Sequence, residues 1–369
     1  MMNDSKDLSV VFILSHKKGG MVHYTVQLVE KISKNCQVTI IGQKEKIDYD
    51  FNESINVINL LEDVPGGLSI FNIKKIVSFY NLREIKKINP DVIHVTIPHP
   101  LTALFLIPLR KYPIVITIHE PDLHEGADIY ERLIDLSYKI FFRISNKILV
   151  HCLKAKKILS KRGVSPDKIE VVPHGDYSFF TKYTKKFPKK RNHILFFGHI
   201  REYKGLKYLI QAMNLIIKEI PDVKLIIAGD GDFSKYESLI FNENNFEIIN
   251  EYIPDKLTSE LFEISEIVVL PYIQATQSGV LNIAYAFKKP VITTDVGCIP
   301  EYVDDGKTGL IVPPKDPEAL SNAIISLLKN NNLRKQMGEN AFQKMETEFS
   351  WDKIAQKTIG TYKKTINTK

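Results

Sequence analysis

The 369-residue sequence predicts an α/β protein that contains two doubly wound parallel sheets. Short β-branched runs alternate with segments of helical periodicity nearly from end to end, the pattern of parallel strands with right-handed crossovers. The alternation stops once, in a basic stretch at residues 177–191, and then restarts. The chain is also too long for one ordinary domain. We therefore expect two Rossmann-like domains, each with its own core.

The first half contains seven apolar runs that predict strands. Helices are expected between most of them, and MVHYTVQLVEKIS (21–33) aligns Val22, Val26 and Val29 on one face at helical spacing. The predicted strands are residues 8–15, 37–42, 55–60, 91–96, 113–119, 146–152 and 168–173.

The second half repeats the pattern after a change of composition. Six basic residues interrupt the apolar periodicity beside Pro188, so we expect a hinge at 181–191 between domains at 1–180 and 192–348. The tail is expected to be helical, with residues 349–369 folding back as a clasp toward the N-terminal domain. Six more strands are predicted at 193–199, 223–229, 246–250, 266–272, 290–295 and 308–313, with helices at 204–219 and 317–329.

Composition excludes several classes of protein. The chain is 44% hydrophobic and 25% charged, which is ordinary for a globular protein. Its three cysteines are far apart and lack metal-ligand spacing, so we expect neither a disulfide framework nor a zinc site, and a reducing cytosol. We expect the N-terminal apolar run to form a strand and not a signal peptide, and no run approaches the roughly 20 residues of a membrane span.

The net charge of +7 includes two basic-aromatic runs, at 137–157 and 177–191. Such runs suit a peripheral contact with an anionic membrane surface or phosphate-bearing substrates. A solvated helix face and a charged linker explain them equally well. Nucleic acid is not expected as a partner, because no recognition motif accompanies the charge.

Function should collect in the strand-to-helix loops, since open parallel sheets bind ligands at the carboxyl ends of their strands. In HKKGGMVHY, Gly19 and Gly20 open a helix, where free amides and the helix dipole favour an anion. A plain tight turn is the alternative. In FFGHIREYKGLKYL, Gly198 and His199 precede Arg201 and Lys204, two permanent cations suited to a departing pyrophosphate.

Two further loops follow later strands. In IIAGDGDFSKY, Gly229 precedes an Asp230-x-Asp232 pair that would suit a metal, although capping of the next helix is the preferred interpretation, and no metal site is predicted. In ATQSGV, Gln277, Ser278, Gly279 and Val280 offer neutral donors at a helix start. No Asp or Glu lies between Glu266 and Asp295, and Lys288 and Lys289 follow, which together suit a diphosphate.

His119 is the histidine we select for catalysis. It ends a buried strand in VITIHEPDLHEG and begins an irregular polar loop, where Glu120, Asp122 and His124 offer hydroxyl-binding groups. The other strand-end histidines, which include His151 and His174, are expected to be structural.

These motifs together resemble family 4 of the retaining nucleotide-sugar glycosyltransferases, which have the two-domain GT-B architecture with domains facing across a cleft. The resemblance spans nearly the whole chain. It is most specific in FFGHIREYKGLKYLIQAM, in LPYIQATQSGVLNIAYAFKKPVITTDVGCIPEYVDDGKTGLIVPP and in FSWDKIA. The ATQSGV-type loop resembles a subgroup of bacterial surface-polysaccharide transferases.

The resemblance implies roles for several residues. Lys204 and an Arg before it would contact the donor diphosphate. The Arg expected directly after Gly198 is replaced by His199, so its role would pass to Arg201. His119 would lie near the reacting sugar, and Gly19 and Gly20 near the phosphates.

The sequence departs from the family at two positions. Most members have two glutamates in the donor loop, where this chain has Ala275 and Ile283. Gln274, Gln277 and Asn282 become candidates for their recognition roles by chemistry alone.

We therefore expect a metal-independent retaining transferase without a cofactor. It would move a sugar from a UDP- or GDP-sugar to a glycan or lipid-linked acceptor, in the cytoplasm or on the inner face of the cell membrane. A non-catalytic partner of a transferase, a nucleotide-sugar epimerase or a glycosyl phosphorylase remain alternatives on the same architecture.

Overall fold

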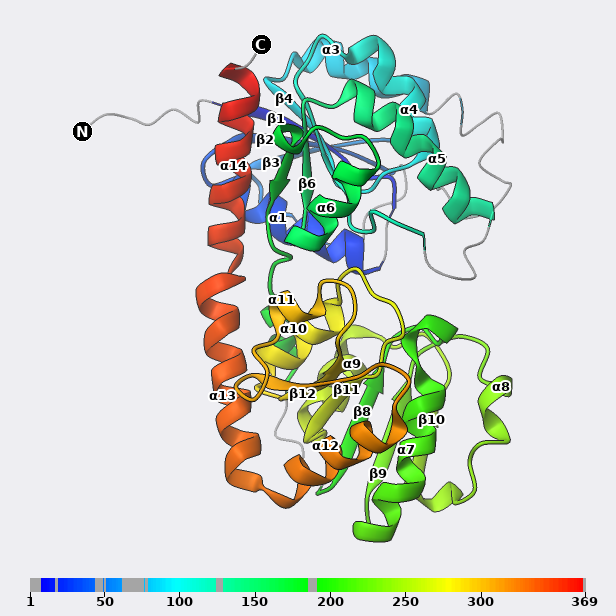
Figure 1. Cartoon of the computed structure of the whole chain (residues 1–369). Coiled ribbons are helices and arrows are strands. Elements are labelled where there is room, and N and C mark those ends of the chain that lie inside the picture. The colour runs from blue at the N-terminus through cyan, green and yellow to red at the C-terminus, as the bar shows by residue number, and fades with distance from the viewer. Residues whose placement is uncertain are drawn as a thin grey trace, which may run out of the picture. The chain divides into compact units, whose positions relative to one another are not determined.

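The structure, a computed structural model, describes residues 8–16, 19–43, 49, 51–61, 76, 79–123, 129–184 and 191–367. It divides into two compact units, one formed by residues 1–175 with 351–369 and the other by 176–350 (Figure 1). Residues 176–184 thus belong to the second unit, and most of the predicted hinge, 185–190, lies outside the described residues.

The first unit is built on a seven-stranded parallel sheet of order β3-β2-β1-β4-β5-β6-β7. All seven predicted strands are confirmed, because buried β-branched runs bounded by loops give a strong local signal. They are β1 (Ser9–Ile13), β2 (Gln37–Gln43), β3 (Ile55–Leu61), β4 (Val92–Val95), β5 (Ile114–Thr117), β6 (Lys147–Val150) and β7 (Ile169–Val171).

Helices lie between these strands. The predicted helix at 21–33 is α1, which begins at Gly20 and ends at Ile32. The others are α3 (Ile85–Ile88), α4 (Pro100–Leu106), α5 (Ile129–Ile144) and α6 (Leu153–Lys161), with short 3₁₀ turns at Asn81–Glu84, Ile107–Leu109 and Pro166–Lys168.

The C-terminal helix α14 (Trp351–Asn367) completes the core of the first unit. Trp351, Ile354 and Tyr362 are buried in one cluster with the apolar face of α1, so residues distant in sequence share a core. A hydrogen bond of 2.6 Å joins the Tyr362 hydroxyl to Nδ1 of His94 on β4. The helical C-terminus predicted from FSWDKIA is therefore confirmed.

The second unit contains a six-stranded parallel sheet of order β10-β9-β8-β11-β12-β13, and all six predicted strands are present. Its core is a cluster that includes Phe196, Met213 and Ile227. The strands are β8 (His193–Phe197), β9 (Lys224–Ala228), β10 (Phe246–Ile249), β11 (Ile267–Leu270), β12 (Val291–Thr294) and β13 (Gly309–Val312).

The helix predicted at 204–219 begins two residues later, as α7 (Leu206–Glu219), because Gly205 has a left-handed conformation with φ of 69° that ends a 3₁₀ turn at Glu202–Lys204. The remaining helices are α8 (Ser234–Glu237), α9 (Asp255–Ile264), α10 (Gly279–Ala286), α11 (Ile299–Tyr302), α12 (Pro317–Lys329) and α13 (Asn331–Glu348), with 3₁₀ turns at Ser178–Tyr183 and Glu243–Asn245.

Candidate functional site

In the second unit, the loop after β8 is fixed against the loop after β11. A Cβ added at Gly205 would lie 1.9 Å from the carbonyl oxygen of Pro271, so only glycine permits this approach. The backbone N–H of Ile273 donates to the carbonyl oxygen of Tyr203 at 2.7 Å. The residue between these contacts, Lys204, is therefore held beside the loop that leads into α10.

The Lys204 ammonium lies directly over Gly198. Its Nζ is 2.7 Å from the position that a Cβ at Gly198 would occupy, and that position is 3.7 Å from Cγ2 of Val280. Nζ also lies 6.0 Å from the ring centroid of Tyr272. The structure thus brings together Gly198 and Lys204 of one predicted loop and Val280 of another. A permanent cation beside a helix start is the arrangement that an anion requires.

Gly198 and Gly229 allow two backbones to meet at the ends of β8 and β9. Both have positive φ, 100° and 149°, and a Cβ at Gly229 would lie 2.3 Å from the Gly198 carbonyl oxygen. The Gly198 N–H donates to Ala228 at 2.8 Å. In the described structure the backbone at Gly229 therefore fixes the position of Gly198, and the Lys204 ammonium lies over Gly198.

The Asp230-x-Asp232 pair makes protein contacts. Nδ1 of His199 lies 2.6 Å from Oδ1 of Asp230, and both side chains are about half exposed. Asp232 accepts a hydrogen bond of 2.5 Å from the Ser234 hydroxyl, at the first residue of α8, which lowers the pKa of the Asp232 carboxyl. Among the described residues, no group of three or more His, Cys, Asp or Glu side chains is placed to hold a metal ion.

The loop between β11 and α10 is held from several sides. The Thr294 hydroxyl donates to the carbonyl oxygen of Tyr272 at 2.6 Å, and the Tyr272 hydroxyl lies 3.0 Å from the Ser278 hydroxyl. Gly297, with φ of 57°, passes so close to Ala275 that an added Cβ would lie 1.5 Å from its carbonyl oxygen. These contacts fix the position of the loop and of the first residues of α10.

The start of α10 carries no acidic side chain, and one amide oxygen in the loop before it is buried. α10 begins at Gly279 as expected, has no acidic residue in its first turn, and is not capped by the Ser278 side chain. The Oε1 atom of Gln277 is buried and has no hydrogen-bond partner among the described residues. An unpartnered buried amide oxygen is costly in a native protein, so Gln277 suits a ligand hydroxyl or amide.

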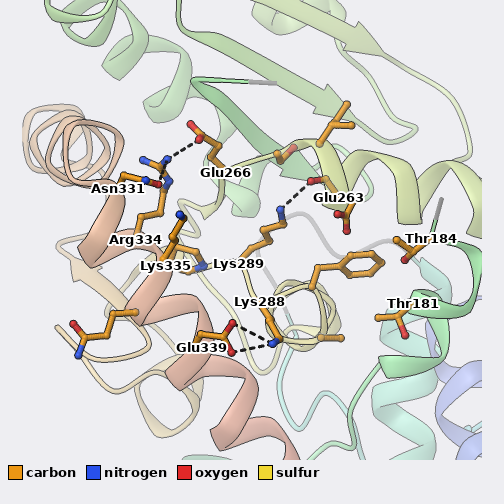
Figure 2. Close-up of a pocket in the computed structure, with 16 residues that line it drawn as sticks. Thr181, Thr184, Glu263, Glu266, Lys288, Lys289, Asn331, Arg334, Lys335 and Glu339 are labelled. Carbon is orange, nitrogen blue, oxygen red and sulfur yellow. Dashed lines mark hydrogen bonds and ion pairs between the residues drawn. The ribbon is translucent and has the colours of Figure 1, made fainter. Parts of the chain in front are cut away.

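The predicted contribution of Lys288 and Lys289 to this anion site is wrong. They follow the C-terminus of α10, roughly 12 Å from its start at 1.5 Å per residue. Lys288 pairs with Glu339 at 2.9 Å, and Lys289 donates to the carbonyl oxygen of Glu263 at 2.9 Å (Figure 2). Both line a cavity of about 790 Å³ at the amino ends of β11 and β12, where Arg334 is paired with Glu266.

The two positions where the family has glutamates differ from each other in burial. Ile283 is only 5% exposed and is part of the buried face of α10, so its side chain serves the core. Ala275 is half-buried beside Gly297. Asn282, which sequence chemistry offered as a substitute, is 1% exposed.

In the first unit, Gly19 and Gly20 form the predicted helix entry. Gly19 has φ of 101° and precedes α1, and its carbonyl oxygen accepts from Val22 at 2.9 Å. A Cβ at Gly19 would meet no described residue within 4 Å. Its left-handed conformation, and not crowding, is what requires glycine there.

His119 lies two residues beyond β5, and its side chain is only 5% exposed, so its ring is buried at the start of the polar loop. Its Nε2 lies 3.0 Å from the carbonyl oxygen of Thr96, and its Nδ1 lies 2.9 Å from Nε2 of His151. Burial lowers the pKa of His119 to about 4. Glu120 and Asp122 are exposed beside it, and His124 lies outside the described residues.

Sequence reasoning missed the residues that surround His119. The rings of His119, His151 and His174 all pack against the ring of Tyr24, with centroid separations of 4.8, 5.3 and 5.0 Å. The signal was present in the chain, because the three histidines closely follow β5, β6 and β7, which are adjacent in the sheet. Trp351 of α14 closes the cluster, 5.3 Å from Tyr24.

Comparisons with known proteins bear on both units. Residues 18–175 match the glycosyltransferase family 4 model, and residues 180–344 match the model described as glycosyl transferases group 1. The chain is a glycosyltransferase of the GT-B fold. Across the described residues, this glycosyltransferase has no helix that is long and apolar enough to cross a membrane.

Individual relatives cover most of this glycosyltransferase. An uncharacterized glycosyltransferase of Methanocaldococcus jannaschii is 27% identical over 91% of this chain and 92% of its own length. The capsular polysaccharide biosynthesis glycosyltransferase CapM of Staphylococcus aureus is 23% identical over 87% and 89%. The crystal structure of HepE of Anabaena in complex with UDP-glucose superposes with a TM-score of 0.74 at 16% identity, covering 97% of this chain and all of that one.

Proposed function

We propose that this glycosyltransferase moves a sugar from a UDP- or GDP-sugar to a glycan or lipid-linked acceptor, with retention at the anomeric carbon, in the synthesis of a cell-surface polysaccharide. The observation that carries the donor assignment is the Lys204 ammonium over Gly198 at the uncapped start of α10. The similarity to HepE, solved with UDP-glucose, supports a nucleotide-sugar donor, and the similarity to CapM supports the polysaccharide.

The proposed mechanism relies on positive charge and orientation. Lys204, Arg201 and the amides at the start of α10 stabilise the charge that the diphosphate gains as it leaves the sugar. The acceptor hydroxyl attacks on the face from which the diphosphate departs, and the leaving phosphate takes the proton. The absence of Asp and Glu between residues 266 and 295 fits this scheme, because a carboxylate there would repel the diphosphate.

No metal or cofactor is part of this proposal. Arg201 and Lys204 supply the charge that a divalent cation provides in other transferases, and Asp230 and Asp232 are held by His199 and Ser234. We expect activity to persist in EDTA. If EDTA abolished the activity and Mg²⁺ or Mn²⁺ restored it, the enzyme would depend on a metal. Asp230 and Asp232 would then be the candidate ligands.

A peripheral contact with an anionic membrane surface is proposed for α5. Leu136 is 56% exposed on this helix, and Lys139 and Arg143 continue the same surface. Lys139 and Arg143 line a cavity of about 440 Å³ together with Lys168 and with Arg162, which also pairs with Asp135 of α5 at 2.7 Å. Basic residues beside exposed apolar ones suit the anionic headgroups of a membrane surface. A lipid-linked acceptor would be presented at that surface.

A donor panel tests the proposed function. The protein is incubated with UDP- and GDP-sugars and a membrane extract that contains endogenous acceptors, and both nucleotide release and sugar incorporation are followed. Release that depends on the acceptor supports transfer. Conversion of the sugar without nucleotide release would instead identify an epimerase, and the absence of both would contradict the proposal.

A further inference from the structure

The cavity at the C-terminal end of α5 lies apart from the loops that carry the candidate site. Its volume is about 440 Å³, and its walls are the last two turns of α5 and the connection from α6 to β7, residues 162–168. α5 leads into β6 and this connection leads into β7, so the cavity lies at the amino edge of the first sheet. His119 lies at the opposite, carboxyl edge, and α5 is about 24 Å long. The cavity is therefore a separate feature of the first unit.

Three cations that line this cavity form no ion pair with a carboxylate in the part of the chain that the structure describes. Lys139 and Arg143 lie one turn apart on α5, where their like charges repel each other weakly. Lys168 comes from the second wall. The fourth cation, Arg162, is already paired with Asp135 at 2.7 Å and is part of the wall. An anion in the cavity would therefore meet three charges that the described protein does not compensate.

Lys168 is half-buried, whereas Lys139 and Arg143 are exposed. Its Nζ donates to the carbonyl oxygen of Phe142 at 2.9 Å, which leaves two N–H groups of the ammonium for other acceptors. Desolvation lowers the pKa of Lys168 from its usual value, because burial disfavours the charged form. The Ser165 hydroxyl lines the same cavity and does not cap the 3₁₀ turn that follows it. A phosphate would offset the desolvation of the ammonium and accept hydrogen bonds from both side chains.

The two exposed cations belong to a stripe of basic and apolar residues along α5. The stripe consists of exposed residues spaced three or four positions apart, which therefore share one face of the helix. They are Ile129, Arg132, Leu136, Lys139 and Arg143. Ile129 is 64% exposed and Leu136 is 56% exposed, although a surface helix usually turns its apolar residues toward the core. Exposed apolar residues among cations, without an acidic residue, are typical of a helix that lies in a membrane interface.

α4 adds exposed apolar residues to the same unit. It packs against α5 (Figure 1). Leu104 on α4 is 50% exposed, and Ile107, directly after it, is 41% exposed. A free phosphate ion would make no contact with these apolar side chains, whereas a phospholipid offers both a phosphate and an apolar boundary beneath it. The exposed side chains therefore favour a lipid over a soluble anion as the source of the phosphate.

We propose that the cavity binds the phosphate group of an anionic glycerophospholipid, while the α5 stripe lies in the plane of the membrane interface. The proposal rests on the membrane contact of the proposed function and gives that contact a specific phosphate site. Lys139, Arg143 and Lys168 surround the phosphate, and the Ser165 hydroxyl donates to it. Leu136 enters the boundary between headgroups and acyl chains. The first unit thereby recognises the headgroup and not only the charge of the surface.

Sedimentation of the full chain with lipid vesicles tests the proposal. Phosphatidylcholine vesicles that contain phosphatidylglycerol are compared with phosphatidylcholine vesicles that contain cholesteryl hemisuccinate, whose anionic group is a carboxylate, at matched zeta potential. We expect tighter binding to the phosphatidylglycerol vesicles. Lys168→Met keeps an unbranched apolar side chain and should weaken that binding about fivefold, the effect of one cation at an anionic surface. The preference for phosphatidylglycerol over the hemisuccinate should disappear in this variant.

A double variant provides a second test if Lys168→Met fails to fold, because Lys168 also bonds the end of α5. Lys139→Gln combined with Arg143→Gln changes only exposed side chains and should weaken binding to phosphatidylglycerol vesicles about 25-fold. Lys357→Gln combined with Lys363→Gln is the matched control, because it removes two exposed cations from α14 and should leave the binding unchanged. α14 packs against α1, which covers the opposite face of the sheet from α5, since their crossovers run in opposite directions along it.

Three results would overturn the proposal. Equal binding of the unmodified protein to the two kinds of vesicle would show that surface charge alone acts. An unchanged preference for phosphatidylglycerol in the variants of the cavity would place the phosphate elsewhere. These two results would leave the transferase and its membrane contact standing. Binding to neither kind of vesicle would remove the membrane contact together with this inference, and calorimetry with inorganic phosphate would then show whether the cavity holds a soluble anion instead. The donor panel tests transfer independently of all three.

Discussion

The carboxyl edges of the two sheets have opposite chemistry on the same architecture. At the edge of the first sheet, His119, His151 and His174 are buried around Tyr24, and burial lowers the pKa of each ring. At the edge of the second, glycines expose the backbone and Lys204 stands over Gly198. The topology supplies the position in both cases, whereas the loop residues decide whether that position holds a neutral cluster or a fixed cation.

The largest expected effect concerns the cation of the second edge. Lys204→Ala should lower kcat/KM about 10²- to 10³-fold, because it removes a charge that stabilises the departing diphosphate. Lys207→Ala, three residues along the same segment and exposed, is the matched control and should retain activity. Steady-state kinetics with the donor identified by the panel provide the measurement. Equal kinetics for the two variants would remove Lys204 from the mechanism.

The next effect concerns the backbone that positions this cation. Gly205→Ala should destabilise the second unit by about 2 to 4 kcal/mol, because φ is 69° and the Pro271 carbonyl occupies the space of a Cβ. Gly306→Ala is the matched control, with φ of 74° and open space, and should cost only about 1 kcal/mol. Chemical denaturation followed by circular dichroism compares them. Equal losses of stability in the two variants would mean that the close approach of Gly205 to the Pro271 carbonyl is not required.

Acid should weaken the first unit because its histidines are buried without charge. Burial lowers the pKa of His94 and His174 to about 3 and of His119 to about 4, below the value of 6.5 for the unfolded chain. The unfolded state therefore binds protons first, and the stability present above pH 6.5 is lost as pH falls toward 4. The expected loss is about 1 kcal/mol per histidine for each pH unit below 6.5.

Trp351 makes that loss measurable in one unit. It is the only tryptophan of the chain and is buried against Tyr24 in the first unit. Urea denaturation followed by its fluorescence at pH 7.5 and pH 5 should give a clearly lower free energy of unfolding at pH 5. An unchanged value would show that the histidine cluster is open to water.

The smallest expected effect tests the attachment of the C-terminal helix. Tyr362→Phe removes the hydroxyl that bonds Nδ1 of His94 at 2.6 Å and should cost about 1 to 2 kcal/mol. Tyr208→Phe, on a half-buried residue of the second unit, serves as a control and should change the stability reported by Trp351 fluorescence little. An equal loss of stability in Tyr208→Phe would show that the hydrogen bond between Tyr362 and His94 has no specific effect on the first unit.

The same comparison explains what could be predicted from the sequence. All thirteen described strands were predicted, because buried parallel strands are continuous β-branched runs and need only local information. Gly198, Lys204 and Gly279 were selected as candidates because a glycine or a basic residue directly after a strand is visible in the local sequence, and the structure places Lys204 over Gly198 and begins α10 at Gly279. The burial of His119 and its pairing with His151 were not predicted, since they depend on contacts between strands far apart in the chain.

Two other errors have physical causes. Lys288 and Lys289 were assigned to the anion site because they follow its loop closely in sequence. Helix α10 separates the loop from the two lysines, and they therefore lie at the opposite edge of the sheet. The start of α7 was placed too early, because a 3₁₀ turn ending at Gly205 has helical composition without being part of the helix.

The proposed mechanism depends on a nucleotide diphosphate bound by Lys204 and the first amides of α10. A crystal structure with the intact UDP- or GDP-sugar tests this most directly. We predict that diphosphate oxygens lie within hydrogen-bond distance of Nζ of Lys204 and of the backbone N–H groups of Gly279 or Val280, with Gln277 turned toward the ligand. A diphosphate bound elsewhere, with Lys204 contacting only solvent, would contradict it.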